Sequence, residues 1–228
     1  MSPAETAGPS VSSGPSWGAL ARQALRSPAL LRADEGREVA TSARLLLLGM
    51  AGAAAFGTVA GSLHGDVQAL YAAVKLPLVV VVPLLASLPT LHWLLGAAGD
   101  PRPWQALTRE AALAVARIGL LLVAFVPVVW VTWGVGPSHA VAVRVLAAVV
   151  AAAFVLGMRE LFLVASAREG GVVGRGLAVV LLALTLGQAS WALRPFVGAP
   201  GDERVFLVGA DGLFVRGLVD PMYRDGGR

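Results

Sequence analysis

Few residues in this 228-residue chain are of types that do chemistry. There is no cysteine, which excludes disulfides, thiolate nucleophiles and thiolate metal sites. The three histidines, His64, His92 and His139, have no HxxH, HxH or HExxH spacing, so no metal site is expected. A GxSxG motif, a P-loop and paired intramembrane carboxylates are also missing. The sequence therefore predicts that the protein is not an enzyme and that it binds no cofactor.

Polar residues within or beside long apolar runs are the remaining candidates for function, because they are costly inside a bilayer. They are Lys75, His92, Gln188, Trp191 and Arg194. His92 could titrate near neutral pH or bind a metal, but a histidine without a partner at helical spacing is more often a packing residue. Gln188, Trp191 and Arg194 lie on one flank of a helix. They face either a vestibule or lipid headgroups, or they form an ordinary interfacial anchor, which is the commoner case.

The amino-acid composition indicates whether this chain folds in water or in a lipid bilayer. Hydrophobic residues make up 57% and charged residues 14% of the sequence, and the mean hydropathy is +0.74. A soluble domain is about 45–50% apolar and about 25% charged. One core cannot hide so much apolar surface, since a chain of this length leaves roughly a quarter to a third of its surface exposed. A soluble enzyme domain, a disordered chain and a disulfide scaffold are excluded, and a lipid bilayer is the expected environment.

Basic residues are scattered between the apolar runs rather than clustered on one soluble face. The formal net charge is +4, and 17 of the 18 basic residues are arginine, Lys75 being the only lysine. Nucleic-acid binding needs a basic patch with readout groups beside it, so no nucleic-acid partner is expected.

Five apolar runs define the elements that would position these side chains. We expect an all-α, polytopic transmembrane helical bundle of about five spans within residues 43–195. The spans are expected at about 44–64, 74–98, 113–135, 140–164 and 174–194. The fourth is the weakest, because it is long enough to cross only if Arg144 and Arg159 snorkel to opposite interfaces.

The second span carries Pro77, Pro83 and Pro89 and is expected to be kinked. In the first span, Gly49, Ala53, Gly57 and Gly61 recur every four residues and form one stripe of small side chains. Such a stripe lets two helix backbones approach closely. It indicates either a homodimer or, more commonly, packing against another helix of the same chain.

The regions outside the spans are polar or only partly apolar. Residues 1–16 are expected to be a disordered tail. Residues 17–42 form a basic amphipathic juxtamembrane segment, which either lies on an anionic membrane surface or only orients the first span. Residues 196–228 are expected to be an interfacial tail, since its apolar patches are too short to span.

Arginine placement predicts the topology. Segments 22–44, 102–117 and 159–175 hold five, three and three basic residues, whereas 64–75 and 136–144 hold one each. The positive-inside rule therefore places the N-terminus in the cytoplasm. Five spans would place the C-terminal tail outside, although the five arginines of that tail argue for the opposite side.

Two segments resemble an uncharacterised family of bacterial multi-spanning membrane proteins. They are residues 71–96, in which Lys75, Leu76 and Pro77 open a span that carries Pro89, and residues 187–207, in which Arg194, Pro195, Phe196 and Gly198 close the last span. The architecture is also similar, by analogy only, to the Yip1-type five-span domain. The chain departs from the family at Asp220–Tyr223, where an aromatic stretch is usual. The resemblance implies a bacterial inner-membrane protein and no particular activity.

The functional hypotheses follow from this inventory. Glu160 is the only acid expected near membrane depth, which argues against an ion-coupled transporter. We therefore expect a non-enzymatic membrane component that works by homo-oligomer assembly or by binding a membrane-protein partner. The alternative is a small channel or passive permease, indicated by the three prolines of the second span, with a pore lined by Lys75, Arg117, Arg144 and Gln188.

Overall fold

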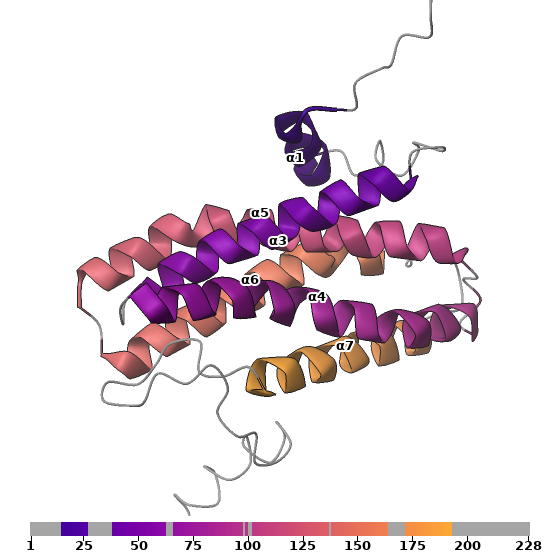
Figure 1. The fold of residues 1–228 in the computed structure, drawn as a ribbon. Helices are drawn as coiled ribbons and strands as arrows, with labels where there is room; N and C mark the ends of the chain where they lie inside the picture. The colour runs from indigo at the N-terminus through magenta and orange to yellow at the C-terminus, as the bar shows by residue number, and fades with distance from the viewer. Residues whose placement is uncertain are drawn as a thin grey trace, which may run out of the picture.

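The computed structural model describes residues 15–26, 38–62, 66–97, 99, 102–136, 138–163 and 172–192. Over these residues the protein is a bundle of helices without a strand, as the sequence predicts. The helices are α1 (Trp17–Arg26), α3 (Glu38–Gly61), α4 (Asp66–Ala97), α5 (Trp104–Gly134), α6 (His139–Leu163) and α7 (Val172–Ala192) (Figure 1). The expected all-α bundle is thereby confirmed.

Four of the helices are long and apolar enough to cross a membrane. Their candidate spans are Val39–Gly61, Val67–Ala97, Trp104–Gly134 and Val141–Arg159. The last of these lies in α6, the helix that was weakest by sequence. The helix α7 has 21 residues and contributes a shorter apolar stretch, Val180–Ala189. The chain is a membrane protein, and its helices fit a bundle of about five spans.

The long helices run back and forth, each antiparallel to the next along the chain (Figure 1). The helix α3 packs against both α4 and α5, α6 packs against α5, and α7 packs against α4. The short helix α1 lies across α3 and α5 at a steep angle to the bundle (Figure 1). Because the helices alternate in direction, α4 and α6 end, and α5 and α7 begin, at the end of the bundle where α3 begins.

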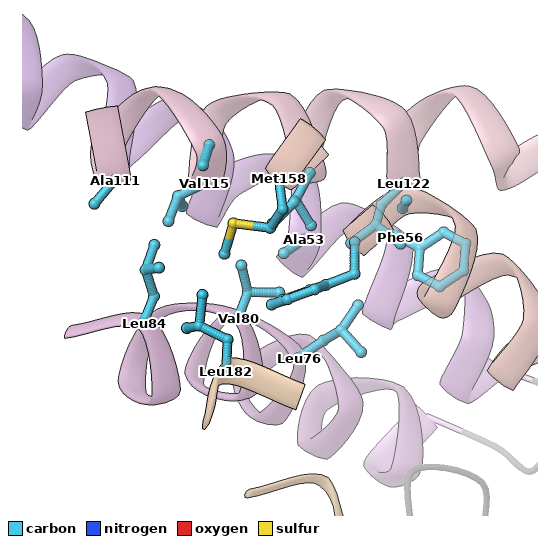
Figure 2. Close-up of a cluster of buried hydrophobic side chains, with 14 of the residues drawn as sticks. Ala53, Phe56, Leu76, Val80, Leu84, Ala111, Val115, Leu122, Met158 and Leu182 are labelled. Atoms are coloured by element: carbon cyan, nitrogen blue, oxygen red, sulfur yellow. The ribbon is translucent and has the colours of Figure 1, made fainter. Parts of the chain in front are cut away.

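The core is formed by aliphatic side chains, with Phe56 of α3 fully buried among them. Figure 2 shows Leu182 of α7 beside Val80 and Leu84 of α4, with Met158 of α6 near Val80. Large apolar side chains also cover the outside of the bundle, and Val155, for example, is 70% exposed. An apolar exterior of this extent is stable in lipid and not in water.

Three helices begin earlier than the expected spans, and α3 is one of them, since it starts at Glu38 rather than near residue 44. The helix α4 starts at Asp66 rather than near residue 74, and α5 starts at Trp104 rather than near residue 113. Hydropathy detects only the uncharged part of a helix, whereas the helix itself continues until the chain turns. For α5 the turn is set by Pro103, whose extended backbone (φ −61°, ψ 147°) precedes the first helical residue.

The helix α4 continues through Pro77, Pro83 and Pro89. Each proline removes one backbone donor, so a carbonyl one turn earlier loses its usual partner. Side chains can occupy backbone acceptors in such a helix, and Ser87 Oγ donates a hydrogen bond of 2.7 Å to the carbonyl oxygen of Pro83.

Candidate functional site

The stripe of small residues on α3 is covered by two other helices of the same chain. At its first half, a methyl group on Gly49 would collide with the backbone of Val115 in α5. At its second half, a Cβ on Gly57 would collide with the carbonyl oxygen of Ala72 in α4. The stripe therefore packs internally, which leaves no free surface for a homodimer through this face.

A second pair of glycines completes the α3–α5 contact and was not singled out in the sequence. A Cβ on Gly52 would lie 2.6 Å from the carbonyl oxygen of Gly119, and a Cβ on Gly119 would collide with the backbone of Gly49. The backbones of α3 and α5 touch here, since no side chain separates them. Van der Waals contact of this kind is what joins helices in lipid, where no hydrophobic drive brings them together.

The contact between α3 and α4 fixes the depth of Lys75. Gly57 contacts Ala72, and Gly61 contacts Gln68. Residues four apart on α3 therefore contact residues four apart on α4 in the reverse order, as two antiparallel helices do. Continuing this antiparallel register by three residues places Lys75 level with Ala54. Ala54 lies one residue from the centre of the uncharged run 45–65. Lys75 is thus level with the middle of a span, deeper than the entrance position that its sequence context suggested.

Lys75 is fully buried, with no exposed surface. Gln68, seven residues or about two turns closer to the start of α4, is also buried. Residues at this spacing share a helix face, so α4 carries a buried polar strip along its first three turns. A buried ionisable side chain at this depth is the strongest candidate for function in the bundle.

Gln188 of α7 lies in the same half of the bundle as Lys75. Leu182 of α7 packs in the core beside Val80 and Leu84 of α4 (Figure 2). Gln188 is six residues further along α7, about 9 Å toward the end at which α4 begins. Its side chain is half-buried. The structure thus brings Lys75 and Gln188 to a similar level on two adjacent helices.

His92 does not join this pair. His92 lies near the opposite end of α4, is exposed, and packs edge-on against Trp104, with ring centroids 5.6 Å apart and an interplanar angle of 82°. This contact is the packing role expected for a lone histidine. The side chain of Trp191, at the end of α7, and the whole of Arg194 lie outside the described residues.

An ion pair that the sequence analysis missed lies at the start of α5. Arg102 Nη1 donates to Glu110 Oε2, and both side chains are almost buried. Glu110 is eight residues from Arg102, and the two are not neighbours on one helix face, since Arg102 lies before the start of α5 at Trp104. Arginine clustering was noticed in the sequence, but nothing there showed that Glu110 faces inward.

Within the described residues, no three histidine, aspartate or glutamate side chains are placed to hold a metal ion. The candidate site that the described residues offer is a buried lysine and a half-buried amide within an apolar bundle.

Small residues also lie on the outside of the bundle, on α6. Ala147, Ala148 and Ala151 are exposed, and Val155 continues the same face one turn further. We call these four residues the α6 alanine face. On the opposite side of α6, Gly157 packs so closely on Ile118 of α5 that a methyl group there would collide with its side chain. The helix is therefore attached to the bundle by one face and presents the alanine face outward.

The chain matches no known protein family, no curated protein and no solved structure. The resemblance of residues 71–96 and 187–207 to a bacterial membrane family therefore stays a prediction.

Proposed function

We propose that this chain is a non-enzymatic component of the bacterial cytoplasmic membrane, with its N-terminus in the cytoplasm, that works by lateral assembly with a second copy of itself. The observation that carries the proposal is the exposure of the α6 alanine face. The equivalent face on α3 is covered by α4 and α5, as small-residue faces in lipid generally are. No described residue covers the α6 alanine face, and this exposure supports a further helix as its partner.

A second copy suits this face better than an unrelated helix. An isologous dimer brings the same patch of both subunits together, so the patch must be complementary to itself. Ala147 and Ala151 are small, uncharged and one turn apart. A flat row of such side chains can pack against the same row of a second copy without further shape complementarity. The lipid-facing Val155 would extend the contact by one turn.

Disulfide crosslinking tests the dimer cleanly, because the chain has no cysteine of its own. We expect Ala151→Cys to form a crosslinked dimer when native membranes are oxidised. The matched control is Leu184→Cys, an exposed position on α7, which is expected to stay uncrosslinked. Native mass spectrometry of the unmodified chain should show the same dimer. A monomer in both experiments, or equal crosslinking at both positions, would overturn the proposal.

The burial of Lys75 favours a second candidate function, a small channel or passive permease. Lys75 is level with the middle of a span, and half-buried Gln188 lies at a similar level on the neighbouring helix. The two side chains could form a polar binding site along the path of a permeating solute. The glycine contacts exclude a path between α3 and α5, so a path past Lys75 would have to run on another side of α4.

Accessibility of position 75 separates the two candidates. In sealed vesicles, Lys75→Cys is expected to resist a membrane-impermeant thiol reagent from either side if the protein only assembles. Val67→Cys, which is exposed near the start of α4, provides the reactive control. Labelling of position 75 at a rate close to that of position 67 would favour the permease.

A further inference from the structure

The helix α1 is attached to the bundle by two small contacts. Leu20 and Ala24, one turn apart, are both fully buried against α3 and α5. Their partners are Leu45 on α3 and Ala112, Leu113 and Ala116 on α5. A segment of only ten residues is marginal as an isolated helix in water, so this docking is what gives α1 a fixed position.

The docking position lies at the edge of the apolar part of the bundle. Leu45 is the first residue of the uncharged run of α3, and Arg44 immediately precedes it. On α5 the contact begins three residues after Arg109. Because charged side chains mark the boundary of the hydrocarbon region, α1 lies at the level of the lipid headgroups. Its steep angle to the bundle then directs it along the membrane surface (Figure 1).

The rest of α1 divides into an apolar flank and a basic face. Trp17, Ala21 and Leu25 recur every four residues and form the apolar flank, of which Trp17 and Leu25 are exposed. Arg22 and Arg26 form the adjacent outward face, and both are exposed. The segment Trp17–Arg26 contains no acidic residue. Arg44, exposed on α3 beside the docking position, adds a third positive charge at the same level.

We propose that α1 is a lipid-binding helix that binds the anionic headgroups of the adjacent leaflet. The apolar flank enters the boundary between headgroups and acyl chains, where tryptophan is favoured. Arg22, Arg26 and Arg44 bind the lipid phosphates, and the absence of acids on α1 leaves this charge uncompensated within the helix. The partner is the membrane itself, which the positive charge and the exposed apolar flank both fit. The inference is independent of the proposed dimer.

A single label on the intact chain tests this placement. Leu25→Cys carries an environment-sensitive fluorophore, and the full-length protein is reconstituted in nanodiscs of phosphatidylcholine with or without phosphatidylglycerol. Quenching by a nitroxide-bearing lipid is compared with quenching by aqueous iodide. We expect lipid quenching to dominate, and to increase when phosphatidylglycerol is present.

Removal of the charges isolates the contribution of the headgroups. In the labelled chain, Arg22→Gln and Arg26→Gln are each expected to lower the ratio of membrane-bound to released α1 by about fivefold on phosphatidylglycerol. On phosphatidylcholine alone they should have little effect. The matched control is Arg159→Gln, an exposed arginine on α6, which should change nothing at position 25. High salt should mimic the arginine variants, because it screens surface charges.

Three results would overturn the proposal. Iodide quenching that is stronger than lipid quenching, both with and without phosphatidylglycerol, would place α1 in water. Protection of position 25 from both quenchers would show that protein, rather than lipid, covers this face. An unchanged response to phosphatidylglycerol in the Arg22→Gln, Arg26→Gln double variant would show that the arginines do not bind the headgroups.

Discussion

Gly49 of α3 and Gly119 of α5 lie so close together that a methyl group on Gly119 would collide with the backbone of Gly49. Both helices therefore rely on the absence of a side chain at one crossing point. Since α3 is also covered by α4 through Gly57 and Gly61, it is the helix around which the bundle is assembled. The stability of the whole bundle should depend on this contact.

The first prediction concerns that crossing. Gly119→Leu must push α3 and α5 apart, because the atoms it would meet are backbone atoms that cannot rotate away. Overpacking of a core costs about 1–3 kcal/mol and sometimes more. We expect a lower midpoint of thermal unfolding in detergent, measured by the loss of monodisperse protein. Gly96→Leu, where nothing lies within 4 Å, is the control and should have little effect.

The second prediction compares a buried and a lipid-facing side chain. Phe56 has no exposed surface and packs at the centre of the core (Figure 2). Phe56→Ala leaves a cavity and should lower the free energy of unfolding by about 3–5 kcal/mol. Val180→Ala, on the exposed side of α7 and outside the α6 alanine face, removes a group that already contacts the surrounding lipid and should change the free energy of unfolding by less than about 0.5 kcal/mol. Similar losses at both positions, in chemical unfolding from mixed micelles, would contradict the assigned core.

These two sites illustrate what sequence reasoning can and cannot reach. The period of four in Gly49, Ala53, Gly57 and Gly61 predicted a packing face, because helix geometry alone places them together. Gly119 was missed, since the partner of a stripe depends on which helix crosses it and at what register. Its own sequence neighbours, Ile118 and Leu120, give no sign of a crossing.

Lys75 shows the corresponding limit for a candidate site. Its identity as the only lysine, before a proline-bearing run, was visible in the sequence. Its depth was not, because hydropathy places the start of a span at the first uncharged residue, whereas α4 begins at Asp66. The antiparallel contacts of Gly57 and Gly61 with α4 supply the missing register. Gln188 was identified as a candidate from its residue type. Only the packing of Leu182 against α4 shows that Gln188 lies at a depth similar to that of Lys75.

The third prediction concerns the ion pair at the start of α5. Arg102 and Glu110 are each about nine-tenths buried, so removal of one leaves the other with an uncompensated charge. Arg102→Gln and Glu110→Gln should each destabilise the protein by about 3–5 kcal/mol, as for other buried pairs. The double variant should be less unstable than the sum of the two. A double-mutant cycle measured by denaturant unfolding would give the coupling, and strict additivity would show that the pair contributes nothing.

The fourth prediction concerns the orientation of the bundle. With Lys75 inside a span, the connection between α3 and α4 loses its only basic residue, while Arg102 and Arg109 remain at the opposite end. The asymmetry that the positive-inside rule uses is thereby strengthened, and the rule predicts that the start of α5 lies in the cytoplasm. Two exposed positions report the two ends, Gln105 at the start of α5 and Ser138 before α6.

In intact cells with an opened outer envelope, Ser138→Cys should react with a membrane-impermeant maleimide, whereas Gln105→Cys should react only after the cytoplasmic membrane is broken. The chain without cysteine provides a blank, so every signal comes from the introduced thiol. The reverse pattern would invert the bundle and place α1 and its arginines on the outer leaflet. Reaction of both positions in intact cells would instead show a mixed orientation, because charge asymmetry alone would then be too weak to fix the topology.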